Sequence, residues 1–230
     1  MDTPTVPPPP RVAVWLFYGV QVLAMAGLLA ALVWLIAVPP FPGRLAGVLV
    51  FVAAWLERMW SMYVRLGRGR ASAAAGRDWS ALAVGYSFAL VVSGGIVEFL
   101  LRRHGLGADG HTLAGVAVYA ASLALRYWAF AELGRQFHID VSDPGRDRRL
   151  IRTGPYRFLR HPIYAASCLE AVGLPLLLGA WYALALAVCV FIPLEVARAR
   201  YEERFLREVF GPDYDRFKAE VPGFLPRWRI

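Results

Sequence analysis

Apolar stretches long enough to cross a membrane alternate with short polar stretches along this chain of 230 residues. Hydrocarbon about 30 Å thick requires a helix of about 20 predominantly apolar residues. Two shorter apolar stretches flank Gly179 and predict a tight helical hairpin, residues 163–178 and 181–197. Four earlier stretches meet the full length and predict transmembrane helices at residues 12–38, 45–66, 79–101 and 112–133.

The composition agrees with this pattern and separates the chain from soluble proteins. Hydrophobic residues make up 58% of it and charged residues 18%, whereas soluble domains are about 45–50% apolar and about 25% charged. The predicted fold class is all-α, a polytopic transmembrane helical bundle of five to six spans. We divide it into a disordered, proline-rich lead (1–11), four transmembrane helices (12–133) and a C-terminal half (134–230).

Basic residues gather in alternate connections between the predicted helices. Residues 65–77 carry four arginines and residues 134–161 carry seven. The positive-inside rule makes both connections cytoplasmic, and both termini then lie on the cytoplasmic side. The formal net charge of +8 is explained by this clustering, so we predict no nucleic-acid partner.

Several kinds of functional site are absent from the sequence. Cys168 and Cys189 lie in apolar stretches, where small buried side chains are expected, and give no disulfide framework. The four histidines lack the spacing of metal ligands, so no metal site is predicted. The chain also lacks a G-x-G-x-x-G loop, a Walker A sequence and an H-E-x-x-H motif.

The segment before the predicted hairpin concentrates hydrogen-bond donors at the membrane surface. Gly154 and Pro155 predict a turn, and Pro162 suits the first turn of the following helix. Arg157, Arg160 and His161 lie beside the free N–H groups of that helix start, a place that suits an anion or a carboxylate. Alternatively, the two arginines bind lipid head groups.

A second group of charged residues follows the hairpin. Arg198 and Glu202 are four residues apart and share a helical face, and Glu203 lies on a neighbouring face. Taken by itself, this spacing also fits an ordinary solvated helix with an ion pair. Gly211 and Pro212 break the helix, and residues 213–220 predict a further short one.

Ionisable residues also occur within the apolar stretches, where each is a candidate for function. Glu98 and Glu132 lie near helix ends and are predicted to extend to the interface. Glu170 and Glu195 lie on the two arms of the hairpin, and we predict that they face the same cavity. Arg126 lies within the fourth helix.

These motifs together resemble the isoprenylcysteine carboxyl methyltransferases and the related phospholipid methyltransferases. The first signature is similar to residues 154–157 followed by Arg160-His161-Pro162 and Tyr164. The second is similar to Arg198 with Glu202-Glu203, followed by Phe210-Gly211 and Tyr214. The resemblance covers roughly residues 125–227. It departs from the family pattern after Tyr164, where Ala165 and Ala166 stand in place of a residue and then Gly.

The resemblance implies that residues 134–230 form a cofactor-binding catalytic half, which holds S-adenosylmethionine at the cytoplasmic face. A lipophilic acceptor would enter from the bilayer, and membrane lipids would surround the protein. The implied catalytic residues are Arg198, Glu202 and Glu203, and Arg200 is the second choice to Arg198 for binding the substrate. Arg126, Glu170 and Glu195 are candidate substrate-binding residues because they are ionisable and lie within apolar stretches. The implied cofactor-binding residues are Gly154, Tyr156, Arg160, His161, Pro162, Tyr164 and Glu203.

The acceptor class stays open between a carboxylate and a phenolic oxygen. A carboxylate needs only an arginine to hold it, whereas a phenol or an amine also needs a proton acceptor, for which Glu203 or His161 would serve. The segment 137–140 resembles bacterial members of the family and favours a bacterial plasma membrane.

Two other functions compete with methyl transfer. Membrane sterol reductases resemble this family in their cofactor-binding half but use NADPH, and a carrier or assembly factor would have no catalytic role. The adjacent Glu202 and Glu203 favour the methyltransferase.

Overall fold

The computed structural model describes residues 42–66, 79–102, 105–134 and 150–224, together with Leu29 and Val33. Within these ranges the chain forms helices and turns and no strand, so the predicted all-α class is confirmed. The lead and most of the first predicted helix lie outside the described residues, as do residues 135–149 of the long basic loop.

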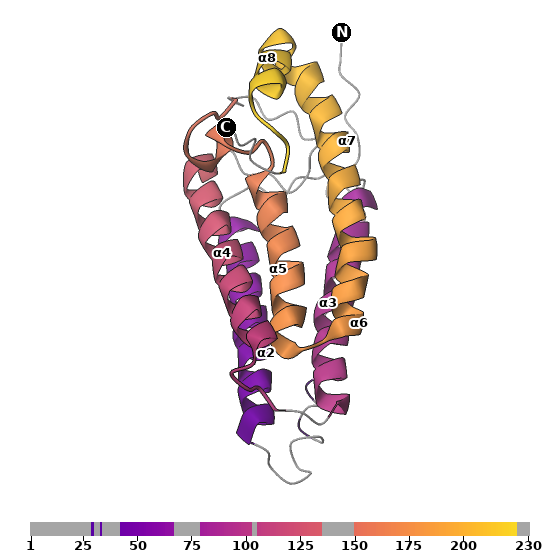
Figure 1. Ribbon diagram of the computed structural model, residues 1–230. Helices are drawn as coiled ribbons and strands as arrows, with labels where there is room; N and C mark the ends of the chain where they lie inside the picture. Colours follow the sequence, from indigo (N-terminus) through magenta and orange to yellow (C-terminus); the bar gives the residue numbers. More distant parts are fainter. Residues whose placement is uncertain are drawn as a thin grey trace.

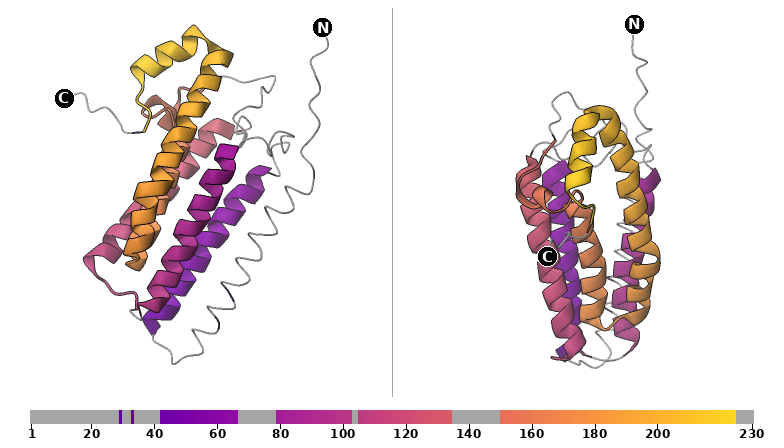
Figure 2. Two further views of the ribbon diagram at one scale, coloured as in Figure 1. Left: turned by 90° about the vertical axis from the view of Figure 1, so that its right-hand side faces the viewer. Right: turned by 45° about the horizontal axis from the view of Figure 1, so that its top comes forward.

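The long helices run side by side as an elongated bundle, and a short helix lies across one end of it (Figure 1). A 3-10 turn, η2, precedes α5, and a π-helical turn, η3, joins α6 to α7. The two further views agree that α8 lies at the end of the bundle where α5 begins (Figure 2). The elements are α2 (Pro42–Leu66), α3 (Trp79–Leu101), α4 (Gly110–Leu133), η2 (Gly154–Arg157), α5 (Pro162–Leu178), α6 (Trp181–Leu186), η3 (Ala187–Phe191), α7 (Ile192–Phe210) and α8 (Pro212–Glu220).

The predicted hairpin forms at Gly179, which ends α5 with a positive φ of 63°. This left-handed conformation is one that glycine adopts without strain, and the turn is closed by a bond from the N–H of Ala180 to the carbonyl of Pro175 at 2.8 Å. The second arm continues without interruption through α6, η3 and α7 to Phe210, which agrees with the prediction that a charged helix continues from this arm. Gly211 then breaks the helix, as predicted, with a φ of 53°.

The start of α6 is capped by a carboxylate from another helix. Glu98 of α3 accepts hydrogen bonds from the N–H groups of Tyr182 and Ala183, at 2.9 and 3.1 Å, and pairs with Arg102 at 2.8 Å. Glu98 is buried. We predicted that this side chain extends to the interface, whereas the structure gives it the free N–H groups of a helix start, which attract a carboxylate.

Three stretches of the described residues are long and apolar enough to cross a membrane, namely Ala83–Leu101, Gly110–Leu133 and Trp181–Phe210, and α5 is a shorter apolar helix. Large apolar side chains are exposed on their outer faces, including Leu90, Leu113 and Val190. Such exposure is expected for a surface that faces lipid. The exact number of spans stays a prediction.

Helices α4 and α5 pack closely because glycines lie at their contact. A Cβ added to Gly115 of α4 would overlap the backbone of Leu177, and one added to Gly173 of α5 would lie 2.7 Å from the Tyr119 nitrogen. Small residues allow helix backbones to approach in this way within membranes. The contact fixes which faces of α4 and α5 meet.

We expect Gly115→Ala to lower the midpoint of thermal unfolding in detergent, although alanine favours helix by about 1 kcal/mol over glycine. The added methyl group forces α4 away from Leu177, a backbone contact that cannot yield locally. Gly94→Ala on α3 is the matched control, because an added Cβ there meets nothing within 4 Å. Equal midpoints for the two variants would contradict the close contact.

Candidate functional site

The turn before α5 is docked on the end of α4. Gly154 has a φ of 56°, and a Cβ there would overlap the side chain of Glu132. The hydroxyl of Thr153 donates a hydrogen bond to Glu132 Oε2 at 2.7 Å, so this carboxylate has a specific partner. Pro155 and Tyr156, both part of the turn, are buried. These contacts fix the point from which the chain enters α5.

Arg160 and Glu203 form the centre of the site. Glu203 Oε1 accepts hydrogen bonds from Arg160 Nε at 2.9 Å and Arg160 Nη2 at 2.6 Å, and Lys218 Nζ donates to Glu203 Oε2 at 2.7 Å. His161 Nε2 lies 3.1 Å from Glu203 Oε1. We call these four residues, Arg160, His161, Glu203 and Lys218, the Glu203 junction. It joins the start of α5 to α7 and α8.

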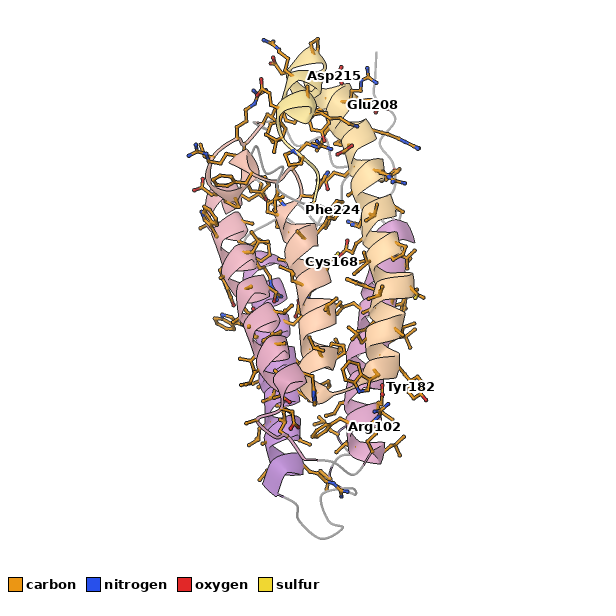
Figure 3. All side chains as sticks on the ribbon, viewed as in Figure 1. Arg102, Cys168, Tyr182, Glu208, Asp215 and Phe224 are labelled. Atoms are coloured by element: carbon orange, nitrogen blue, oxygen red, sulfur yellow. The ribbon has the colours of Figure 1, made fainter. Side chains whose placement is uncertain are left out.

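The chain after α8 is held by the same junction. Arg160 Nη1 donates to the carbonyls of Lys218, at 3.1 Å, and of Val221. The backbone N–H groups of Arg160 and His161 donate to the carbonyls of Pro222 and Gly223, at 2.8 and 3.1 Å. We call residues 221–224 the tail segment. It lies against the start of α5, where Figure 3 labels Phe224.

Three aromatic rings gather beside the junction. The ring of His161 stacks nearly parallel to that of Tyr164, with centres 5.6 Å apart and planes at 18°. Phe224 of the tail segment lies 5.7 Å from His161. His161 itself is buried, and its Nδ1 lies 3.8 Å from Glu202 Oε2. The cluster therefore combines ring faces with carboxylates.

Further along α7 towards the middle of the bundle lie two buried charged side chains. The guanidinium carbon of Arg198 lies 5.9 Å from the ring centre of Tyr164. Glu195 is 2% exposed, and its Oε2 has no hydrogen-bond partner among the described residues. Arg200, the second arginine of the motif, is exposed. The placement favours Arg198 over Arg200 for any role inside the site.

Glu170 and Arg126 belong to a separate network between α2, α4 and α5. Glu170 Oε2 pairs with Arg58 at 2.6 Å and with Arg126 at 2.9 Å. Arg126 also lies 3.5 Å from Glu57, whose other oxygen accepts a hydrogen bond from Tyr127 at 2.8 Å. We call Glu57, Arg58, Arg126 and Glu170 the buried ion network. Arg58 of this network is also within electrostatic range of Glu195, so the prediction that the two hairpin carboxylates face one cavity stays a prediction.

A cavity of about 370 Å³ opens at the opposite end of the bundle. Its lining includes Arg102, His111 and Trp181, and Figure 3 labels Arg102 at the end away from Phe224. None of the residues selected by the motifs lines this cavity. The chemistry of the motifs therefore concentrates at the other end, around the Glu203 junction.

Known proteins resemble the half of the chain that carries these residues. Residues 111–213 match the family model described as phospholipid methyltransferase. The protein-S-isoprenylcysteine O-methyltransferase of Schizosaccharomyces pombe is 32% identical over 103 residues, 44% of each chain. The structure of the eukaryotic intramembrane Ras methyltransferase ICMT has a TM-score of 0.58 at 17% identity, covering 94% of this chain and 85% of that one. The chain is a relative of the isoprenylcysteine carboxyl methyltransferases.

The relationship also extends to bacterial proteins with other names. The cobalt-zinc-cadmium resistance protein CzcN of Cupriavidus metallidurans is 30% identical over 132 residues, 57% of this chain and 61% of that protein. The matches span less than half of the S. pombe enzyme and less than two thirds of CzcN. This relative of the isoprenylcysteine carboxyl methyltransferases is an integral membrane protein, as its apolar helices and its fold indicate.

The family signatures identify the centre of the site in this methyltransferase relative but not its whole extent. Arg160, His161 and Glu203 were selected from the sequence and meet in one cluster. Lys218 and Phe224 were missed. Lys218 lies in α8 and Phe224 follows it, and no periodic pattern in this part of the sequence indicated their positions. Glu57 and Arg58 could have been selected, because two charged residues within an apolar stretch indicate ionic partners on other helices.

Proposed function

We propose that this protein transfers a methyl group from S-adenosylmethionine to a lipophilic acceptor dissolved in the membrane. The observation that carries the proposal is the Glu203 junction, because it joins residues of both family signatures by direct contacts. The sequence similarity to methyltransferases over residues 111–213 supports it. The acceptor oxygen belongs to a carboxylate or a phenol.

The residues around the junction fit the chemical groups of S-adenosylmethionine. Adenine binds to aromatic ring faces, which His161, Tyr164 and Phe224 present together. A sulfonium centre is stabilised by aromatic faces and by carboxylates, of which Glu195 and Glu202 are candidates. Glu195 Oε2 is a buried polar atom without a hydrogen-bond partner among the described residues, as expected where a ligand supplies one. When bound, the cofactor supplies an activated methyl group.

The protein's own residues position the reactants and exclude water in this proposal. Arg160 and Lys218 neutralise Glu203 and hold the tail segment over the start of α5. This tail segment shields the ring of His161, which is buried. Arg198 lies deeper and donates hydrogen bonds to the acceptor. Gly154 and Tyr156 belong to the turn that packs on α4, and this turn sets the position of His161. Pro162 begins α5.

The proposal includes the side of the membrane. The junction lies at the end of the bundle adjoining the basic loop, and the positive-inside rule assigns that loop to the cytoplasm. A water-soluble cofactor would then bind from the cytoplasm of a bacterial cell, and the acceptor would enter from the bilayer.

Calorimetric titration of the detergent-purified protein with S-adenosylhomocysteine tests the cofactor. We expect binding, and about tenfold weaker binding by His161→Ala, which removes one ring of the aromatic cluster and one contact to Glu203. NADPH is titrated in parallel. Binding of NADPH without S-adenosylhomocysteine would replace the proposal by the reductase function, and binding of neither would contradict both.

A further inference from the structure

The cavity at the end of the bundle away from the Glu203 junction lies where three apolar stretches begin or end. At this end of the bundle, the stretches long enough to cross a membrane have their boundaries at Leu101, Gly110 and Trp181. The cavity is lined by Trp181 itself and by Arg102 and His111, which are the neighbours of the other two boundaries. In a bilayer the cavity therefore lies at the boundary between the hydrocarbon and the head groups.

The lining of this cavity is partly apolar and partly charged. Phe99, Leu177 and Leu178 line it and belong to the buried core of the bundle. Arg102 and Asp109 line it from outside the apolar stretches. The volume of about 370 Å³ lies within the range of about 300–1,000 Å³ that is typical of ligand pockets. These properties suit an amphiphile with an apolar part and a polar head group.

Two contacts fix the guanidinium of Arg102 at the cavity. Its Nη2 pairs with the buried Glu98 at 2.8 Å, and its central carbon lies 5.7 Å from the ring centre of Tyr182, which is labelled near Arg102 in Figure 3. A guanidinium has five N–H donors, and these two contacts use only part of that capacity. The side chain of Arg102 is 37% exposed. An arginine placed in this way can bind a phosphate through charge-assisted hydrogen bonds.

The carboxylate of Asp109 is not used to cap a helix. Asp109 is the N-cap residue of α4, a position where an aspartate side chain usually accepts a hydrogen bond from the first turn. Its side chain makes no such bond, although its backbone carbonyl accepts one from the N–H of Leu113 at 3.0 Å. Asp109 is exposed and lines the cavity. Its carboxylate is therefore placed to accept hydrogen bonds from a ligand.

Exposed aromatic and apolar side chains surround the cavity. Trp181 is 46% exposed and Tyr182 78%, and the ring of His111 lies 5.8 Å from that of Trp181. Tryptophan and tyrosine are enriched where a membrane meets water. Leu101 and Leu113, 69% and 61% exposed, lie close to the cavity lining in sequence and offer a surface to acyl chains. This setting favours a lipid over a water-soluble ligand.

We propose that this cavity binds the head group of a phospholipid that carries both a phosphate and a protonated amine. Arg102 binds the phosphate, with His111 as a second donor, and Asp109 accepts hydrogen bonds from the ammonium group. Besides His111, the ionisable side chains among the described lining residues are one cation and one anion. This balance matches a zwitterion better than a purely anionic head group. The cavity lies at the end opposite the Glu203 junction, so this lipid is not the methyl acceptor.

A lipid bound there would connect two parts of the fold. Gly179 and Trp181, at the turn of the helical hairpin, line the same cavity as Arg102 after α3 and Asp109 before α4. Both family signatures lie on the arms of this hairpin or directly beside them. A ligand that binds only the folded protein stabilises it by mass action. We therefore expect the lipid to raise the midpoint of thermal unfolding.

The test measures thermal unfolding of the delipidated, detergent-purified full chain at increasing concentrations of added phospholipid. Phosphatidylethanolamine, phosphatidylcholine and phosphatidylglycerol are compared with the same acyl chains. We expect phosphatidylethanolamine to bind about tenfold more tightly than the other two, which corresponds to about 1.4 kcal/mol. The trimethylammonium group of phosphatidylcholine has no N–H to donate to Asp109, and phosphatidylglycerol brings a net negative charge beside that carboxylate. Water-soluble O-phosphoethanolamine, the same head group without acyl chains, should not bind in this concentration range.

Asp109→Asn tests the carboxylate directly. Asparagine is as good an N-cap residue as aspartate, so the variant should fold while it loses the charge that attracts the ammonium group, and its preference for phosphatidylethanolamine should fall to within about threefold. Asp215→Asn is the matched control, an exposed carboxylate on α8 at the other end of the bundle, labelled in Figure 3. It should keep the full preference.

Each outcome supports or overturns the inference. Equal affinities for phosphatidylethanolamine and phosphatidylcholine, tighter binding of phosphatidylglycerol, or no binding of any of the three would overturn it. Binding of O-phosphoethanolamine as tight as that of the lipid would assign the cavity to a soluble ligand instead. A preference that survives in Asp109→Asn would locate the lipid elsewhere on the protein. The comparison of lipids on the unaltered protein depends on no variant, and it involves no methyl donor, so its failure would leave the proposed function standing.

Discussion

Glu203→Gln is expected to weaken binding of S-adenosylhomocysteine by at least about a hundredfold, which corresponds to about 2.7 kcal/mol. One carboxylate holds Arg160, His161 and Lys218 together, and the side chains of Glu203 and Arg160 are each only 11% exposed. Removing one partner of a buried ion pair costs about 3–5 kcal/mol, because the other charge is left without compensation. The loss also releases the tail segment, since Arg160 no longer has a fixed position from which to bind its carbonyls.

Two measurements separate loss of the site from loss of the fold. Calorimetry gives the affinity for S-adenosylhomocysteine, and limited proteolysis reports whether the chain after α8 has become accessible. Lys218→Met should have a smaller effect, within about tenfold, because the Lys218 side chain is 51% exposed and exposed ion pairs contribute about 0–1 kcal/mol. Glu208→Gln, on the same helix α7 as Glu203, is the control. An affinity for Glu203→Gln within threefold of the unaltered protein would contradict the central role of the Glu203 junction.

The parts of the fold that the sequence predicted are those specified by local chemistry. Gly154, Gly179 and Gly211 adopt positive φ angles at the three places where the sequence predicted a turn or a break. The charged residues of each signature are close in sequence, so their helical spacing was readable. Contact between the signatures came only from the family resemblance. The direct bonds from Arg160 to Glu203 join residues 43 positions apart, a separation that no periodicity encodes.

The sequence did not predict how each helix is rotated about its own axis. This rotation determines which buried charged side chains contact one another. We predicted that Glu170 and Glu195 face one cavity because both lie in the hairpin. Gly115 and Gly173 bring α4 and α5 into close contact, and in this arrangement Glu170 pairs with Arg126 of α4. Hydrophobicity on every side of a membrane helix hides its inward face from pattern analysis. Only the packed structure distinguishes the buried ion network from the proposed site.

Glu170→Leu is expected to lower the free energy of unfolding in detergent by about 3–5 kcal/mol, the cost of breaking a buried ion pair from one side. Glu170 and Arg126 are each 2% exposed, so water does not replace the lost partner. The buried ion network contains two arginines and two carboxylates. The single change leaves the buried Arg126 and the partly exposed Arg58 without the carboxylate that both of them bind. We expect most of the protein to be lost to aggregation during purification, and the remainder to unfold at lower denaturant concentration.

The double variant Arg126→Leu/Glu170→Leu tests whether charge imbalance causes this loss. It removes one charge of each sign, so that one arginine and one carboxylate of the network remain, and it replaces both changed residues by apolar side chains. Such replacement of a buried pair is often neutral or stabilising. We therefore expect the double variant to be more stable than Glu170→Leu alone, with a coupling energy in the range of about 0.5–3 kcal/mol found for contacting residues. If the two single effects simply add, the four charges act independently and the contacts between α2, α4 and α5 derive their stability from the glycine-mediated packing instead.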